Sequence, residues 1–286
     1  GSHICLLLLE KGYNVIAFDS FENSSIKSLE NVKKILEIKK KKVSDNIQII
    51  KGDLKKKVDV TEIFERSLKF NQPIQAVIHM AGLKSVLEST NDPLSYWENN
   101  TSGSINLFQA MKNYECKTIV FSSSATVYEN SKNLINEDQE LKPVNPYGNT
   151  KLSIENILND LYLSDSSKWR IVLLRYFNPI GAHPSGLIGE DPQSKVNNIF
   201  PKITNAAIGL IDEIKIYGSD WPTKDGTGVR DYIHVMDLAE GHLSALNYIK
   251  QNDPKILALN LGTGIGTSVL NLINTFERVN NVNIPF

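Results

Sequence analysis

The chain has 286 residues and carries 31 basic and 32 acidic side chains, which gives a formal net charge of −1. This near-neutral balance provides no general attraction to nucleic acid or to an anionic membrane surface, so we expect neither as a partner. No apolar run approaches the roughly 20 residues of a membrane-spanning helix, and the two distant cysteines, Cys5 and Cys116, favour a reducing, cytoplasmic location over a disulfide scaffold.

In chain order, short β-like runs alternate with longer helical runs. Helices are expected near residues 2–11, 28–41, 59–70, 93–113, 146–163 and 235–250. Strands are expected at residues 15–18, 47–50, 76–79, 118–121, 171–174 and 257–260. This alternation predicts an α/β fold, a doubly wound parallel sheet of the Rossmann type with helices on both faces. After about Tyr176 the alternation stops and Gly and Pro become frequent, which predicts a smaller, loop-rich region.

The first residues are typical of the end of a nucleotide-binding turn. A doubly wound nucleotide-binding domain begins with a strand and a glycine-rich turn that points a helix N-terminus at a pyrophosphate. Gly1 stands where the last glycine of such a turn would lie, so we expect a preceding strand and earlier glycines in the natural chain. A remnant of an expression tag is the alternative. Asp19 closes the next strand, at about the spacing expected of an acidic ribose ligand, and favours NAD over NADP, although a turn-forming Asp is the other interpretation.

The strongest local signal is the segment 145–151. Asn145 is a good N-cap, Pro146 suits the first helical position, and Tyr147 and Lys151 then lie on one helix face. A nearby cation favours a phenolate, so we expect Lys151 to lower the pKa of Tyr147 and to let it act as an acid and base. Ser124, just after a strand, would bind a substrate hydroxyl and relay its proton to Tyr147. An ordinary amphipathic helix and a polar loop are the alternative.

Together these features resemble the extended short-chain dehydrogenase/reductase superfamily and, within it, the UDP-glucose 4-epimerases. The resemblance covers essentially the whole chain, and its most specific stretches are residues 78–84, 122–128, 174–186 and 225–235. It implies an isomerase that interconverts UDP-galactose and UDP-glucose through a transient 4-keto sugar, with NAD as cofactor, in galactose metabolism. It also implies an NAD-binding domain of residues 1–175, to which 235–260 returns, and a substrate-binding region of residues 176–234 and 261–286.

The resemblance assigns roles to individual residues and implies no metal. The catalytic trio is Ser124, Tyr147 and Lys151. Cofactor binding is expected of Gly1, Asp19, Asn23, Ser24, Asp53, Leu54, Met80, Ala81, Gly82, Lys84, Asn99, Ser122, Tyr147, Lys151 and Phe177. Substrate binding is expected of Ser124, Tyr147, Asn178, Asn198, Tyr217 and Arg230. Tyr217 is expected to stack on uracil, and the planar guanidinium of Arg230 suits the substrate diphosphate.

Two alternatives stand beside an active epimerase. Chains of this family usually continue for roughly 50 residues beyond the position of Phe286. Residues 1–286 alone are therefore expected to be impaired, and an inactive fragment that only binds nucleotide-sugar is the first alternative. A nucleotide-sugar dehydratase is the second, and it is disfavoured because Ala125 follows Ser124 where those enzymes place a carboxylate.

The resemblance also implies a homodimer. Related enzymes pair the helices that correspond to residues 93–113 and 146–163. The second of these helices carries more apolar side chains than one contact with a sheet requires, namely Leu152, Ile154, Ile157, Leu158 and Leu161.

Overall fold

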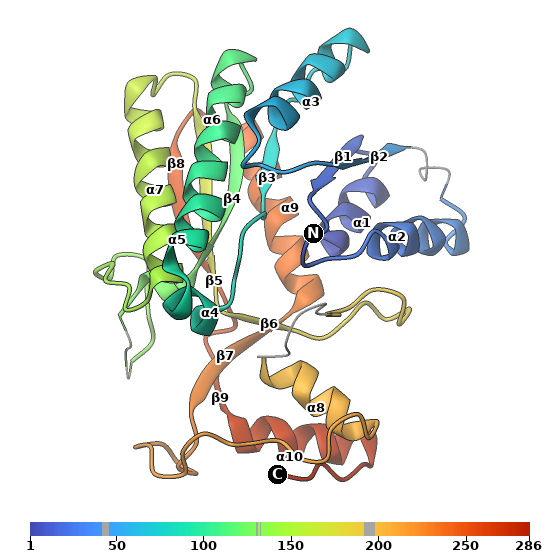
Figure 1. The fold of residues 1–286 in the computed structure, drawn as a ribbon, viewed down its shortest axis with the longest axis vertical. Coiled ribbons are helices and arrows are strands. Elements are labelled where there is room, and N and C mark those ends of the chain that lie inside the picture. Colours follow the sequence, from blue (N-terminus) through green and yellow to red (C-terminus); the bar gives the residue numbers. More distant parts are fainter. Residues whose placement is uncertain (42–45, 130, 132, 192–197) are drawn as a thin grey trace.

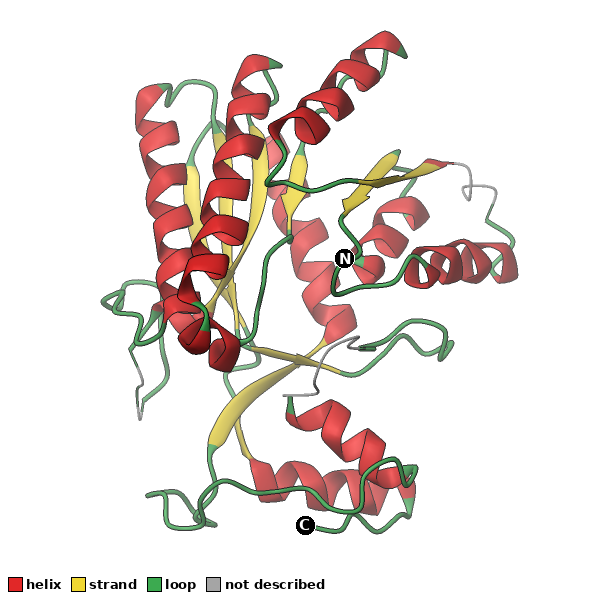
Figure 2. Cartoon of the chain, in the orientation of Figure 1, coloured by secondary structure: helices red, strands yellow, loops and turns green. Residues whose placement is uncertain are grey.

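The computed structural model describes residues 1–41, 46–129, 131, 133–191 and 198–286, and it has an α/β fold with a large and a small part (Figures 1 and 2). The first elements are α1 (Ser2–Glu10), β1 (Val15–Asp19), α2 (Lys27–Ile38), β2 (Ile47–Lys51), α3 (Lys57–Lys69), β3 (Val77–His79), α4 (Val86–Asn91), α5 (Pro93–Tyr96), the π-helix η2 (Trp97–Ser102) and α6 (Gly103–Asn113). They are followed by β4 (Thr118–Ser124), the 3₁₀-helix η3 (Ala125–Val127), α7 (Pro146–Ser164), β5 (Arg170–Tyr176), β6 (Asn178–Ile180), α8 (Ile199–Ala207), β7 (Val229–His234), α9 (Val235–Gln251), β8 (Ile256–Leu261), β9 (Gly266–Ser268) and α10 (Val269–Asn280).

The main sheet has the order β3-β4-β5-β8, and all of its pairs are parallel. Its side chains alternate between the two faces, as strand geometry requires. Ile119 and Phe121 of β4 pack toward α3, α6 and α7, whereas Val120 packs toward α1 and α9. The expected α/β fold with a parallel sheet between helices is therefore confirmed.

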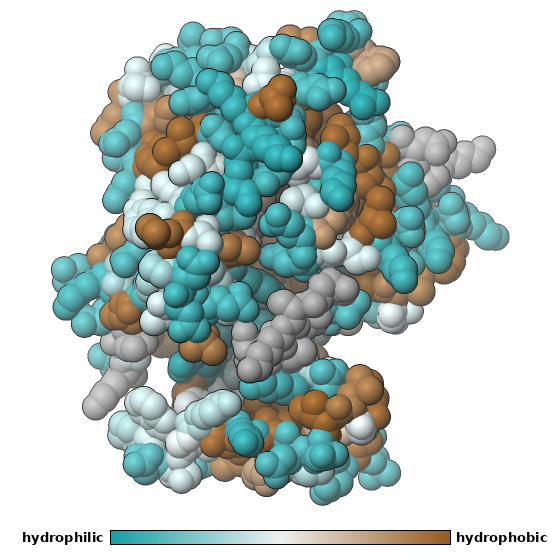
Figure 3. Space-filling model, viewed as in Figure 1, coloured by the Kyte–Doolittle hydropathy of each residue, from teal (hydrophilic) through white to brown (hydrophobic). Residues whose placement is uncertain are grey.

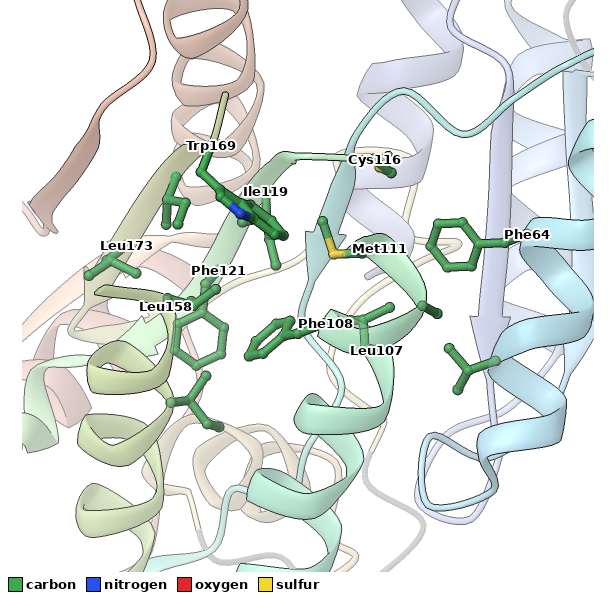
Figure 4. Packing of buried hydrophobic residues seen from close by; sticks show 14 residues of the cluster. Phe64, Leu107, Phe108, Met111, Cys116, Ile119, Phe121, Leu158, Trp169 and Leu173 are labelled. Carbon is green, nitrogen blue, oxygen red and sulfur yellow. The ribbon is translucent and has the colours of Figure 1, made fainter. Parts of the chain in front are cut away.

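The largest of the four hydrophobic clusters in the described residues lies between the sheet and helices α3, α6 and α7 (Figure 4). Trp169 and Leu158 are 1% and 0% exposed there, and Phe108 and Met111 of α6 face them across the cluster. Burial of large apolar side chains at this density fixes α7 rigidly against β4 and β5. The start of α7 is thereby held at the carboxyl end of β4.

The first two strands form a sheet of their own, which differs from the single sheet expected from the sequence. β1 and β2 pair in parallel, with Val15 opposite Ile47, and no described strand hydrogen-bonds them to β3. The two sheets are instead connected by side-chain packing, because α1 contacts both α2 and α9 and Val15 packs against the cluster beneath α9. Alternation of hydrophobic residues detects strands but not which strands are neighbours.

The small part contains a hydrophobic cluster of its own and three short strands. β7 pairs in parallel with β6 and antiparallel with β9, while α8 and α10 enclose a core that includes Ile203 and Ile273. Figure 3 shows apolar surface gathered over this lower part, where Ile208 and Val279 are exposed. None of the helices in the described part of the chain combines the length and apolar character that crossing a membrane requires.

The expected helix at 93–113 is the element that differs most. The chain forms α5, the π-helix η2 and α6 in succession, and only α6 is a regular α-helix of three turns. π-helical turns arise where local contacts insert a residue into the helix, often at functional sites. Here the turn contains Asn99 and Asn100, of which Asn100 is buried and Asn99 is half-buried.

Candidate active site

The start of α7 is formed as its sequence indicates. The Asn145 side-chain oxygen accepts a hydrogen bond of 2.8 Å from the Gly148 N–H, and Pro146 occupies the first turn. Gly148 permits a close approach, since a Cβ there would lie 2.5 Å from the Thr126 carbonyl oxygen. This contact brings Tyr147, only 8% exposed, to the carboxyl end of β4.

Lys151 is buried one turn further along α7, and its charge is held in place by β4. Its Nζ donates a hydrogen bond of 2.9 Å to the Ser122 carbonyl oxygen and lies 4.9 Å from the centre of the Phe121 ring. The distance from Nζ to the centre of the Tyr147 ring is 5.8 Å. Burial lowers the pKa of Lys151 to about 8, and the negative charge of Glu155 opposes that shift.

The pKa of Tyr147 shifts in the direction opposite to the one expected from the sequence. Burial raises it first and Tyr176 raises it further, while a hydrogen bond with Ser124 opposes the rise. Removal of the phenolate from water is therefore the largest influence on this pKa. Ser124 is 7% exposed, and its Oγ accepts a hydrogen bond of 2.9 Å from the Thr126 hydroxyl.

Two buried charges beside this trio were missed by the sequence analysis. Arg175 of β5 and Glu155 of α7 form an ion pair with a shortest distance of 2.7 Å. A charged residue inside an otherwise apolar strand requires a buried partner, and Glu155 repeats the spacing of Tyr147 and Lys151 once more. Both signals were available in the sequence.

A buried histidine was missed as well. His242 of α9 donates from Nδ1 to the Leu238 carbonyl oxygen at 2.8 Å, so its Nε2 accepts from the Ser122 hydroxyl at 3.1 Å. Burial lowers the pKa of His242 to about 4, which keeps the ring neutral. Its ring centre also lies 5.9 Å from that of Tyr176. The hydrogen bond to His242 therefore fixes the Ser122 hydroxyl from the face of the sheet that α9 covers.

The first group of expected cofactor residues lies where β1 ends and α1 begins. The Asp19 Oδ1 accepts hydrogen bonds from the Phe21 N–H at 2.8 Å and from the Ser24 hydroxyl at 2.9 Å. Asn23 is exposed in the same bend. Gly1 is the N-cap residue of α1. Because glycine has no side chain, no N-cap side chain accepts hydrogen bonds from the N–H groups of the first turn.

The second group follows β2. Asp53 and Leu54 are half-buried just after the strand, and the Asn106 side-chain amide of α6 donates to the Leu54 carbonyl oxygen at 2.8 Å. Asp53 accepts a hydrogen bond of 2.9 Å from the Lys55 N–H. These contacts hold the turn after β2 against α6.

The third group follows β3. Met80 is half-buried, whereas Ala81 and Lys84 are exposed. Gly82 has a φ of +153°, and a Cβ there would lie 2.9 Å from the Asn100 side-chain oxygen, so a larger residue would be strained. Asn100, rather than Asn99, makes the hydrogen bonds to this turn.

The expected substrate residues lie at the junction of the two parts and in the small part. Phe177 is half-buried next to the exposed Asn178. Asn198 donates to the Glu190 carboxylate at 2.8 Å, and Lys84 donates to the same oxygen at 3.1 Å. These bonds connect an expected substrate residue with an expected cofactor residue.

Tyr217 and Arg230 are both exposed and make local contacts. Lys202 Nζ lies 5.6 Å from the centre of the Tyr217 ring, and Arg230 Nη1 donates to the Val229 carbonyl oxygen at 2.7 Å. Among the interactions described for residues 198–286, none joins these two side chains to Tyr147. The structure thus brings the expected trio of Ser124, Tyr147 and Lys151 together, whereas no described interaction joins the expected uracil and diphosphate contacts to it.

These residues fit a dinucleotide by their chemistry. The uncovered start of α1 suits a pyrophosphate, a carboxylate at the end of β1 suits ribose hydroxyls, and the turn after β3 has room only for glycine at position 82. The last two features follow the carboxyl ends of the parallel strands β1 and β3, where ligands bind in doubly wound folds.

Comparison with known proteins agrees with this geometry. Residues 1–262 match the model of the NAD dependent epimerase/dehydratase family. The chain is 47% identical over 289 residues to a UDP-glucose 4-epimerase of Bacillus subtilis, with 100% of this chain and 80% of that protein covered. It is 48% identical over 288 residues to UDP-glucose 4-epimerase 2 of Arabidopsis thaliana, with 100% and 79% covered.

A solved structure is similar as well. The UDP-glucose 4-epimerase from Bifidobacterium longum, in complex with NAD+ and UDP, matches with a TM-score of 0.90 and 42% identity, covering 99% of this chain and 81% of that one. The family match, the sequence identities and the shared fold lead to one conclusion. The chain belongs to the NAD dependent epimerase/dehydratase family.

Proposed function

We propose that this chain is an NAD-dependent isomerase that inverts C4 of a UDP-hexose and interconverts UDP-galactose and UDP-glucose. The observation that carries the proposal is the buried group of Ser124, Tyr147 and Lys151 at the carboxyl edge of the main sheet. Its support from comparison is that proteins named UDP-glucose 4-epimerase are 47% and 48% identical to the chain.

Tyr147 is the proposed acid and base. As a phenolate it takes the proton from the sugar 4-hydroxyl, and it returns that proton after the 4-keto sugar has turned over in the site. Ser124, which hydrogen-bonds with Tyr147, positions the same hydroxyl. NAD, when bound, supplies the hydride acceptor for the first half of the reaction and the hydride donor for the second.

Lys151 supplies the charge that the phenolate needs. Because burial raises the pKa of Tyr147, the phenolate forms only next to a charged Lys151. The Lys151 ammonium is fixed by the Ser122 carbonyl oxygen and has further N–H groups to offer the nicotinamide ribose. The remaining proposed cofactor contacts are the residues at the ends of β1, β2 and β3 described above, together with Gly1, Asn99, Ser122 and Phe177.

The small part is proposed to bind the UDP group. Arg230 offers an exposed guanidinium for the diphosphate, Tyr217 offers an exposed ring for uracil, and Asn178 and Asn198 offer amides to the sugar nucleotide. We accordingly propose residues 1–175 with 235–260 as the NAD-binding domain and 176–234 with 261–286 as the substrate-binding region.

The direct test is conversion of UDP-galactose to UDP-glucose by the protein with added NAD, measured by chromatography of the nucleotide-sugars. We expect conversion by the wild-type chain and a loss of at least 100-fold in Tyr147→Phe, since general acid–base catalysis contributes about 10²–10⁴-fold. Tyr162→Phe is the matched control on the same helix and is expected to keep wild-type turnover.

The alternatives give different products in the same assay. A dehydratase would form a 4-keto-6-deoxy sugar, and a chain that only binds nucleotide-sugar would give saturable binding in calorimetry without any product. Either result, with NAD present and the protein folded, would exclude the epimerase.

A homodimer in the cytoplasm is also proposed. Ile154 and Leu158, which the sequence analysis offered for the interface, lie in the core at 1% and 0% exposure and are unsuited to it. Leu94 of α5 and Leu163 of α7 are 77% and 67% exposed and are the better candidates on the same helices. Sedimentation equilibrium is expected to give twice the 32.0 kDa of one chain, and Leu94→Asp to give monomers.

The proposed cytoplasmic location is supported by the two cysteines. Free Cys5 and Cys116 suit a reducing compartment.

A further inference from the structure

Glu155 is held in a single orientation by two strands. From β5, Arg175 donates from Nη2 to Glu155 Oε2 at 2.7 Å and from Nε to Oε1 at 3.0 Å. From β4, the Ser123 hydroxyl donates to the same Oε1. The side chains of Arg175 and Glu155 are 6% and 4% exposed. A carboxylate with these donors on both oxygens has little freedom to move.

Arg175 is itself fixed on its other side. Its Nη1 donates to the Tyr128 hydroxyl at 2.8 Å and to the Glu137 carbonyl oxygen at 3.3 Å. The Tyr128 hydroxyl in turn donates to Asn260 of β8 at 2.8 Å. The guanidinium is therefore a rigid link between α7, β5 and β8.

Stability alone is a weak reason for such a pair. Removing two charges from water costs about as much as their attraction returns, so buried ion pairs add little to folding compared with apolar side chains of the same volume. A role in the neighbouring site is the better explanation, and the positions on α7 point to one.

Lys151 and Glu155 lie on successive turns of α7, and successive residues of β4 hold them. Lys151 donates to the carbonyl oxygen of Ser122, and Glu155 accepts from the hydroxyl of Ser123. The ionisable groups that face Lys151 are Tyr147 and Glu155 on α7 and His79 on β3. Burial lowers the pKa of His79 to about 3, so this ring is neutral. Within the described residues, Glu155 is thus the carboxylate that acts on Lys151.

We infer that Glu155, held by Arg175, is a positioning residue for the proposed epimerase. It fixes the spacing between α7 and β4, and it supplies the negative charge that keeps the Lys151 ammonium charged beside Tyr147. This inference rests on the proposed function of the same site. It adds that the site depends on a carboxylate that touches neither substrate nor cofactor.

The test removes the negative charge of Glu155 and keeps the size of its side chain. In Glu155→Gln we expect the alkaline limb of the kcat–pH profile for UDP-galactose to move to lower pH by about one unit, because a nearby opposite charge shifts a pKa by about 1–3 units. KM for UDP-galactose is expected to stay within about twofold, since Glu155 does not contact the sugar nucleotide. Glu129→Gln, on an exposed pair with Lys142, is the matched control and is expected to leave the profile unchanged.

A second readout does not depend on turnover. NMR of ¹⁵N-labelled lysine side chains can follow the Lys151 ammonium, whose signal is identified by its loss in Lys151→Met. The titration midpoint is expected near pH 8 in the wild type, where burial lowers the pKa of Lys151 to about 8, and about one unit lower in Glu155→Gln.

The double variant Glu155→Gln/Arg175→Met separates charge from packing, because it leaves no unpaired buried ion. We expect it to fold and still to show both shifts. A folded double variant with the wild-type pH profile and the wild-type lysine midpoint would overturn the inference. A wild-type chain that binds NAD but does not epimerise would instead overturn the proposed function, whatever the lysine midpoints are.

Discussion

Replacing Asn100 with alanine is expected to destabilise the protein by about 2–3 kcal/mol. Its side chain accepts from the Leu83 N–H at 2.7 Å and donates to the Leu83 carbonyl oxygen at 3.0 Å and to the Thr150 hydroxyl at 3.1 Å. Each such bond contributes about 1 kcal/mol net, and the two backbone groups of Leu83 would lose their partners. Leu83 is half-buried, so water compensates part of the larger penalty of an unpaired buried group, which keeps the sum in this range.

The measurement is urea denaturation followed by circular dichroism, with Asn99→Ala as the matched control one residue away. Asn99 is half-buried in the same π-helix, and its variant is expected to stay within about 0.5 kcal/mol of the wild type. If Asn99 contacts the cofactor as proposed, Asn99→Ala binds NAD more weakly at unchanged stability. A loss below about 0.5 kcal/mol in Asn100→Ala, or an equal loss in both variants, would refute the reasoning.

Three further predictions concern stability and the start of α7. His79 and His242 have folded pKa values of about 3 and about 4, below the usual value of 6.5. Acid therefore favours the unfolded chain, and the free energy of unfolding from urea denaturation should fall by about 2 kcal/mol for each ring between pH 7 and pH 5. In His242→Gln, the part of this fall that is due to His242 should be absent. Leu158→Ala, at a position 0% exposed, should cost about 3 kcal/mol in the same assay, whereas Leu210→Ala, at 69% exposure, should cost less than about 0.5 kcal/mol. Gly148→Ala would place a Cβ 2.5 Å from a backbone oxygen of η3, so turnover should fall by at least about tenfold, and retained turnover would contradict that contact.

Much of the large part follows from local sequence signals. The N-cap at Asn145 and the i, i+4 spacing of Tyr147 and Lys151 placed both side chains correctly on α7. The strand runs also marked the carboxyl edge where Ser124 lies. These signals act within a few residues, so they can be interpreted without the tertiary structure.

What the sequence did not reveal depends on contacts between distant residues. The separation of β1 and β2 from the main sheet concerns strand neighbours, and periodicity does not encode those. Asn99 and Asn100 are adjacent and chemically identical, so only the π-helical turn decides which of them faces Gly82. The pKa of Tyr147 depends on how much water burial removes, and spacing along a helix contains no such information.

The contrast in exposure between the two parts has a consequence for how substrate preference can change. Ser124, Tyr147 and Lys151 are buried among the contacts that hold α7 to the sheet, so most substitutions there would impair folding as well as turnover. Tyr217 is 77% exposed, and Asn178 and Arg230 are also exposed. Surface substitutions usually change stability by less than about 0.5 kcal/mol. If these three residues bind the substrate as proposed, a mutant library at their positions can sample new nucleotide-sugars while nearly every member still folds.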